Sequence, residues 1–213
     1  MSSFYKNSTF FHSSDQQIRA QIAVINQDYA FYGFNWRLVG IDRTINADWF
    51  NNEYYNTYVG PIICYDVYTK FISTHRPQER AMKRSLHKGG ANTLNVYTVG
   101  FTSHPGLLGY ATFPWAYLGD RTNDGVVLYF KTLPGGGLPT YSLGRTLTHE
   151  AGHWLGLFHT FENGCSAPGD GVADTPAEAT PAYGCPVRRD TCAGGGQDPI
   201  RKLFIMLISP RFL

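Results

Sequence analysis

The chain has 213 residues, of which 43% are hydrophobic and 16% are charged, a composition that can bury a sizeable core and excludes a disordered protein. Its formal net charge of +2 gives no indication of a nucleic-acid or membrane partner. No stretch reaches the roughly 18–20 apolar residues that span a bilayer, and no secretory signal is visible at the start. The length favours one large domain.

The spacing of apolar residues predicts helices and strands in alternation. Ser14 and Gln17 form a capping box before a helix whose isoleucines share one stripe. The nearly all-apolar run 126–130 is typical of a strand covered on both faces. The predicted elements are a helix over 14–29, a strand over 34–41, a helix over 77–87, strands over 94–101 and 126–130, and a helix over 143–155. This order predicts an α/β fold with helices packed on a mostly parallel sheet.

The last predicted helix carries a pattern of metal ligands. His149 and His153 lie about 40° apart on one helical face, so their imidazoles can converge on one ion. His159 would point away if the helix continued, but Gly156 can end the helix and turn the chain back. Three neutral imidazoles leave a fourth position for water, which is the pattern of a catalytic zinc site. We therefore expect one Zn²⁺ per chain.

Glu150 lies at the rim of the ligand face, where it can contact water on the metal without binding the metal. We expect zinc to lower the pKa of that water and Glu150 to act as the general base. The alternative interpretation, a helix with surface histidines, needs several coincidences of spacing. The other histidines are isolated and are expected to be surface or core residues; they are His12, His75, His87 and His104.

The four cysteines indicate an oxidising compartment. Cys165, Cys185 and Cys192 crowd into a segment rich in glycine and proline, while Cys64 stands apart. A segment with little secondary structure gains stability from disulfides, which form outside the reducing cytosol. We therefore expect a secreted protein although no signal is visible.

The wider sequence resembles the pappalysin branch of the metzincin zinc metallopeptidases, and most of all its secreted fungal members. The resemblance covers most of residues 8–52 and 77–200. It is carried by residues 46–50, 94–101, 106–114, 143–165, 169–178, 184–186 and 190–192.

The resemblance implies a metzincin-like fold and a peptidase activity. The fold would be a mixed, mostly parallel, twisted sheet with packed helices, an active-site helix and an irregular, disulfide-stapled C-terminal part. Protein or peptide substrates would bind beside an edge strand near residues 126–130. Cys165 would pair with Cys192. We expect a monomer without nucleic-acid or membrane partners.

The loop from Asp170 to Glu178 has two interpretations. In some pappalysin relatives it binds calcium, and here Asp170, Asp174 and Thr175 would supply oxygen ligands for Ca²⁺. The sequence alone fits a turn-rich linker rimmed by carboxylates equally well.

Two stretches depart from the family pattern. Residues 53–76 form an atypical insertion within a catalytic domain of residues 1–200, and residues 201–213 replace the expected turn with its methionine and the final helix. Met206 lies in an apolar run without turn residues and is not counted as the family methionine. Cys185 would lose its usual partner. We interpret both stretches as translated non-coding sequence or a splice variant, which sequencing of the mature transcript would test.

Three functional interpretations follow. The first is a zinc endopeptidase with Glu150 as general base. The second is a truncated, non-catalytic zinc-binding protein derived from such a peptidase. The third is a zinc hydrolase acting on a non-peptide bond, which the resemblance disfavours. Turnover of casein or gelatin that is blocked by a chelator and restored by zinc separates the first from the second.

Overall fold

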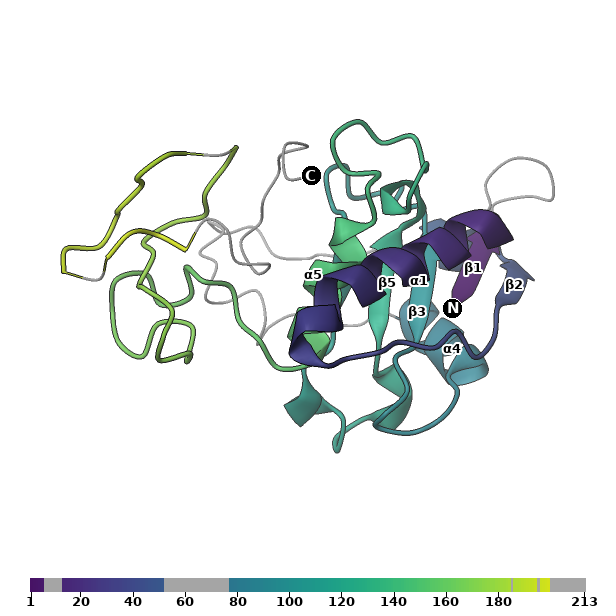
Figure 1. Cartoon of the computed structure of the whole chain (residues 1–213). Coiled ribbons are helices and arrows are strands. Elements are labelled where there is room, and N and C mark those ends of the chain that lie inside the picture. The colour runs from purple at the N-terminus through teal and green to yellow at the C-terminus, as the bar shows by residue number, and fades with distance from the viewer. Residues whose placement is uncertain (6–12, 52–76, 185, 195, 200–213) are drawn as a thin grey trace.

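The computed structural model of the protein describes residues 1–5, 13–51, 77–184, 186–194 and 196–199 (Figure 1). The predictions on the insertion 53–76, on the tail 201–213 with Met206, and on Cys64 and Cys185 lie outside these residues.

A five-stranded sheet forms the centre of the fold, with the strand order β2-β1-β3-β5-β4. β1 is parallel to β2 and to β3, and β3 is parallel to β5, whereas β4 is antiparallel to β5. The strands are β1 (Ser2–Tyr5), β2 (Asp42–Ile45), β3 (Val96–Val99), β4 (Gly109–Ala111) and β5 (Val126–Tyr129). This mixed, mostly parallel sheet confirms the predicted α/β class, and β4 is its antiparallel outer strand.

Helices cover both faces of the sheet. α1 (Asp15–Tyr29) and α5 (Arg145–Trp154) lie side by side on one face (Figure 1), where a core cluster joins them to Val126 and Leu128. α2 (Ala47–Asn51) and α4 (Pro77–Leu86) contribute to a second cluster with Val127. Consecutive side chains of a strand point to opposite faces, so β5 supplies both cores. Short 3₁₀ turns occupy Ala30–Tyr32, Pro114–Ala116, Arg121–Asn123 and Phe130–Thr132.

The helix predictions agree with the structure at their starts. The Ser14 hydroxyl accepts from the Gln17 amide at 3.1 Å, and the Gln17 side chain accepts from the Ser14 amide at 3.0 Å, which is the expected capping box. Leu143 is the exception on the last helix. The helix was predicted to begin at Leu143 but begins only at Arg145, after Gly144 with φ +81°, and Leu143 is exposed.

The predicted strand over 34–41 is wrong. The structure gives these residues no strand, and the strand in this region begins at Asp42. Phe34 and Trp36 instead pack as aromatic neighbours of Tyr29, and Trp36 also contacts Trp154. Their apolar character therefore serves contacts with α1 and α5 rather than a strand ladder. Four short elements, β1, β2, α2 and β4, were not predicted.

The described residues from 155 to 199 contain no α-helix or β-strand and form a separate irregular part of the molecule (Figure 1). A disulfide joins Cys165 to Cys192, the pair that the family resemblance implied. None of the helices in the described part of the chain is long and apolar enough to cross a bilayer.

Candidate metal centre

α5 is held against α1 by polar contacts along its first two turns. The Tyr29 hydroxyl donates to the Thr148 carbonyl at 3.0 Å, and the Gln21 amide donates to the Gly144 carbonyl at 2.8 Å. Asp28 accepts from the Thr148 hydroxyl at 2.6 Å and forms an ion pair with Arg145. These contacts fix the helix that carries the first two candidate ligands.

The C-terminal end of α5 is fixed by a buried carboxylate. Asp124 accepts from the Trp154 indole N–H at 3.0 Å and from the Thr112 hydroxyl at 2.8 Å. Thr112 follows β4, so this carboxylate ties the end of α5 to the outer strand of the sheet.

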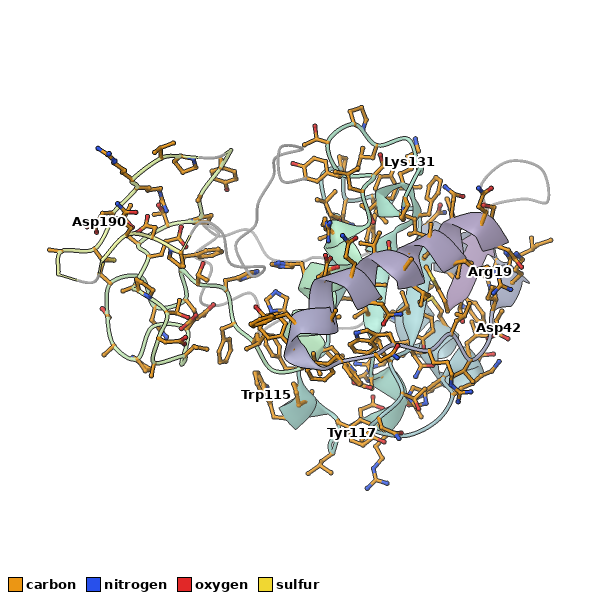
Figure 2. All side chains as sticks on the ribbon, in the orientation of Figure 1. Arg19, Asp42, Trp115, Tyr117, Lys131 and Asp190 are labelled. Carbon is orange, nitrogen blue, oxygen red and sulfur yellow. A yellow bond between two sulfur atoms is a disulfide. The ribbon has the colours of Figure 1, made fainter. Side chains whose placement is uncertain are left out.

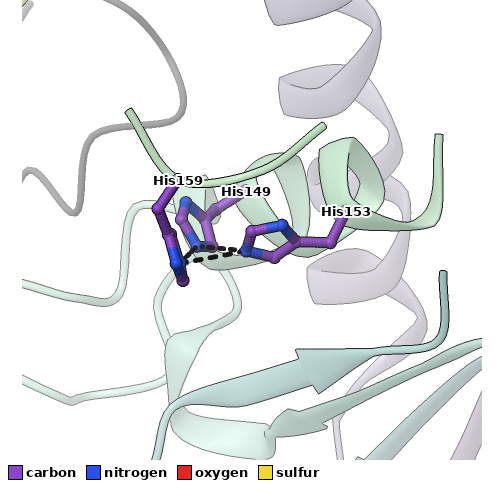
Figure 3. A group of neighbouring side chains, drawn as sticks. All are labelled: His149, His153 and His159. Atoms are coloured by element: carbon purple, nitrogen blue, oxygen red, sulfur yellow. Dashed lines mark hydrogen bonds between the residues drawn. The ribbon is translucent and has the colours of Figure 1, made fainter. Parts of the chain in front are cut away.

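The three predicted ligands come together at one point. The Nε2 atom of His153 lies 3.0 Å from that of His149 and 3.1 Å from that of His159, and the latter two are 3.2 Å apart (Figure 3). Among the described residues, these three form the only group of His, Cys, Asp or Glu side chains that could hold a metal ion.

Gly156 makes this convergence possible. It has φ +101°, its amide donates to the His153 carbonyl at 2.9 Å, and the Leu157 amide donates to the Gly152 carbonyl at 2.9 Å. This pair of bonds is the Schellman motif, which ends a helix through a left-handed residue. The chain then reverses and brings His159 back to the face of α5.

The tautomer of His153 suits a metal ligand. Its Nδ1 lies 2.7 Å from the Leu157 carbonyl oxygen, which can only accept, so Nδ1 carries the proton. The Nε2 atom is then unprotonated and has its lone pair toward the other two rings. Such a backbone contact orients many metal-binding histidines.

The spacing of the nitrogens fits zinc. A tetrahedral ion with bonds of about 2.0–2.1 Å separates its nitrogen ligands by roughly 3.3 Å, close to the separations of 3.0–3.2 Å found here. Three ring nitrogens also correspond to the donor set of catalytic zinc sites with an open fourth position. The residues therefore fit the metal that the pattern predicts.

Burial favours the neutral form of two of the three imidazoles, those of His153 and His159. Burial lowers the pKa of His153 to about 4, against a weaker opposite effect of the Leu157 carbonyl. Burial, and next the nearby His153, lowers the pKa of His159 to about 3. Neutral imidazoles are the form that binds a metal, so His153 and His159 need no deprotonation near neutral pH.

Glu150 is nearly enclosed, with 6% of its surface exposed, and burial raises its pKa to about 8 in the metal-free chain. Its neighbour is the outer strand β4, because a Cβ atom added at Gly109 would lie 3.1 Å from the Glu150 Cγ atom. The missing side chain at Gly109 therefore leaves room for the Cγ atom of Glu150 and for neighbouring atoms of β5. The family-like segment 106–114 contains this glycine, but the sequence did not indicate the contact.

Aromatic rings back two of the three histidines. Phe161 stacks on His159 with 4.8 Å between centroids and 9° between planes, and Phe113 lies 5.3 Å from His153. Trp115, labelled in Figure 2, stacks on Phe113 at 4.4 Å. These rings restrict how the imidazoles can turn, and nothing in the spacing of the sequence had singled them out.

The outer side of β4 offers backbone hydrogen-bonding groups. The Leu108 carbonyl accepts from the Tyr129 amide at 2.8 Å, and the Thr112 amide donates to the Gly125 carbonyl at 3.1 Å. In an antiparallel pair these groups alternate, so the backbone groups of Gly109 and Ala111 face away from β5. No described strand pairs with that side of β4.

The structure gives no support for the calcium prediction. Asp170 accepts from the Val172 amide at 3.0 Å, and Asp174 is exposed. Among the described residues of the loop, no three Asp, Glu, His or Cys side chains bring their ligand atoms together. Thr175 donates its amide to the Val172 carbonyl within a turn, as the linker interpretation expects.

Two comparisons show which known families and sequences the chain is similar to. The model for peptidase family M43, described as pregnancy-associated plasma protein-A, matches residues 108–197. The chain is 44% identical over 190 residues to extracellular metalloprotease 1 of Coccidioides posadasii, covering 88% of this chain and 59% of that protein. It is 42% identical over 193 residues to an extracellular metalloprotease of Verticillium alfalfae, with the same two coverages. The chain therefore spans 59% of the length of these relatives.

The fold is similar to that of a bacterial protein. Mature mirolysin of Tannerella forsythia, solved in complex with a cleaved peptide, superposes with a TM-score of 0.66 at 24% sequence identity. The match covers 97% of this chain and 82% of the other. At this identity the likeness concerns the fold.

Proposed function

The chain belongs to the pappalysin family of metalloproteases, peptidase family M43, and on this basis we propose that it is a zinc-dependent endopeptidase. One observation carries the proposal. Three imidazole nitrogens lie within 3.2 Å of one another, with Glu150 as the residue that follows the first of them. His149, His153 and His159 would hold the metal.

Zinc, when bound, supplies a Lewis acid that acidifies water and polarises a carbonyl group. Glu150 is not a member of the ligand group, and its carboxyl group is available for proton transfer. A nearby cation favours the ionised form of a carboxyl group. In that form Glu150 takes a proton from the attacking water and passes it to the leaving amine of the peptide.

The substrate would be an extended peptide beside β4. The outward backbone groups of Gly109 and Ala111 would pair with it as an added strand, which holds the peptide without requiring a particular sequence. Gly109 also lies against Glu150, so a peptide on this edge would lie near the proposed base. We further propose secretion, because the two relatives are named extracellular and the disulfide suits an oxidising compartment.

Glu150→Gln tests the proposed mechanism. The wild-type chain is expected to degrade casein or gelatin, to lose this activity with a chelator and to regain it with zinc. The variant should lose at least about a hundredfold in turnover, which is typical of removing a general base. It should still bind about one zinc per chain, because Glu150 is not a ligand.

Two controls separate the outcomes. His159→Ala should reduce bound zinc, whereas His87→Ala, outside the ligand group, should change neither zinc content nor turnover. Zinc binding without any turnover by the wild-type chain would favour the non-catalytic zinc-binding protein. Loss of zinc from Glu150→Gln would contradict the role proposed for this residue.

A further inference from the structure

His159 lies in a segment without a helix or strand, and its neighbour Phe158 packs on Phe113 and Trp115 with ring centroids 5.3 and 5.5 Å away. The turn after Gly156 brings the chain back, and the His159 carbonyl accepts from the Glu162 amide at 3.0 Å, but these contacts are local. The next residue, Thr160, is buried with 2% of its surface exposed. On its C-terminal side, the position of the third imidazole therefore depends on what holds Thr160.

Glu178, eighteen residues further along the chain, holds Thr160. The Thr160 hydroxyl donates to Glu178 Oε2 at 2.6 Å, and Glu178 is fully buried. The other carboxylate oxygen of Glu178 forms an ion pair with Arg189. A buried carboxylate with two strong partners has a defined position, because losing either partner would leave charge or polar groups unsatisfied.

Arg189 connects Glu178 to the rest of the irregular part. It pairs with Asp198 at 2.6 Å and donates to the Thr180 carbonyl at 2.8 Å. Asp198 also accepts from the Thr191 amide and hydroxyl, each at 3.0 Å, and Thr191 precedes Cys192 of the disulfide. Buried polar contacts thus replace the missing secondary structure around Glu178.

We infer that Glu178 is a positioning residue for the metal site: through Thr160 it holds His159 at the point where the three imidazoles meet. The inference rests on the proposed function, since it takes the three histidines as the ligands of one zinc ion. It assigns a role in the metal site to buried contacts of the described residues between Leu157 and Pro199. It also explains why Glu178 is fully buried, which a carboxylate on a solvent-exposed loop would not be.

Thr160→Val tests the inference in the full chain. Valine has nearly the shape of threonine but cannot donate to Glu178. Zinc affinity, measured by competition with a chromophoric chelator, should fall about tenfold, the lower range for loss of an outer-shell partner. Thr160→Ser keeps the hydroxyl and should restore the affinity. Glu178→Gln, which removes the charge that pairs with Arg189, should lower the affinity at least as much.

A second measurement needs no metal. Hydrogen exchange of the amides of residues 158–162 in the chelator-treated chain should be faster in Thr160→Val than in Thr160→Ser. Asp190→Asn, at an exposed carboxylate of the same irregular part (Figure 2), is the matched control and should leave affinity and exchange unchanged.

The outcomes are distinguishable. If Thr160→Val is folded and binds zinc as tightly as the wild type, the inference is wrong even though zinc binds. A lower unfolding midpoint with unchanged zinc affinity would mean that Thr160 and Glu178 are only structural, which also overturns it. Should the wild-type chain itself bind no zinc, the proposed function fails first. Should Glu178→Gln fail to fold, the comparison of Thr160→Val with Thr160→Ser still tests whether the Thr160 hydroxyl supports zinc affinity.

Discussion

Gly156 is the single residue on which the meeting of the three histidines depends most directly. Gly156→Ala places a Cβ atom on a backbone with φ +101°, although the nearest atom, Pro114 Cγ, would be 3.5 Å away and leaves room. The left-handed backbone is unfavourable for alanine by about 1–2 kcal/mol, and alanine favours continuing the helix past the turn. We expect the free energy of unfolding to fall by that amount in urea titrations and zinc affinity to fall as well.

Gly40→Ala is the control, because Gly40 has neither a positive φ nor any atom within 4 Å of an added Cβ. Its stability should stay within about 0.5 kcal/mol of the wild type. Equal effects of the two substitutions would show that the conformation of Gly156 has no special role.

The buried titratable groups predict how the stability of the metal-free chain depends on pH. The unfolded chain, with imidazole pKa values near 6.5, binds protons that His153 and His159 reject in the fold, where their pKa values are about 4 and about 3. The contribution of these two histidines to the free energy of unfolding is therefore lost as the pH falls below 6.5. The pKa of Glu150 is raised from 4.5 to about 8, so its effect has the opposite sign. Its contribution to the free energy of unfolding is lost as the pH rises from 4.5 through 8.

Below pH 6.5 two imidazoles outweigh one carboxyl group, so these three groups place maximum stability of the metal-free chain near pH 6.5. Urea unfolding of chelator-treated protein near pH 5, 6.5 and 8 measures this. Glu150→Gln does not titrate and should show a smaller loss between pH 6.5 and 8. The same alkaline loss in wild type and variant would contradict the buried position of Glu150.

At the scale of elements, α5 is held both by polar contacts with α1 and by its apolar face. Asp28 has 7% of its side chain exposed and binds both the Thr148 hydroxyl and Arg145. Asp28→Ala removes both of the contacts that Asp28 makes with α5, and we expect it to lower the free energy of unfolding by about 2 kcal/mol. Chemical denaturation followed by circular dichroism measures the change.

Asp15→Ala is the matched control on the same helix. Asp15 also pairs with an arginine, Arg43, but 63% of its side chain is exposed. Exposed ion pairs contribute at most about 1 kcal/mol because water and salt screen them. If Asp15→Ala destabilised the protein as much as Asp28→Ala, burial of the contact between α1 and α5 would not explain the effect.

At the scale of the whole molecule, the described residues form a layered α/β part and an irregular part, and the three histidines lie where the two parts meet. The disulfide between Cys165 and Cys192 has a sequence separation of 27 residues, for which loop closure alone predicts a stabilisation of about 3–4 kcal/mol. We expect a Cys165→Ser, Cys192→Ser double variant to exchange amide hydrogens faster between residues 157 and 199, while β3 and β5 stay protected. Zinc affinity should also be lower in this double variant, since His159 lies in the segment that loses its disulfide.

Hydrogen exchange followed by mass spectrometry resolves the two parts. Wild-type protein with unreduced cysteines is the reference, and a folded sheet in the variant is the internal control. Faster exchange throughout β3 and β5 would mean that the two parts unfold together. This result would contradict the view that the irregular part is stabilised by its own contacts.

Local sequence pattern was sufficient for much of this protein. The capping box of α1, the strand β5, the helix α5 and the histidine spacing follow from interactions between residues close in the chain. The meeting of His149, His153 and His159 was predictable because a glycine turn and two helical positions lie within eleven residues. The pairing of Cys165 with Cys192 was implied by the family resemblance rather than by spacing.

Other features required the tertiary structure. The aromatic residues of 34–41 had the composition of a strand, and only their packing on Tyr29 and Trp154 shows a different use. The contact of Gly109 with Glu150 and the hydrogen bond from Thr160 to Glu178 join residues that neither adjacency nor periodicity relates. Sequence determines which local conformations and ligands are possible. Contacts between distant segments depend on how layers pack, and this packing decides the surroundings of Glu150 and the support of His159.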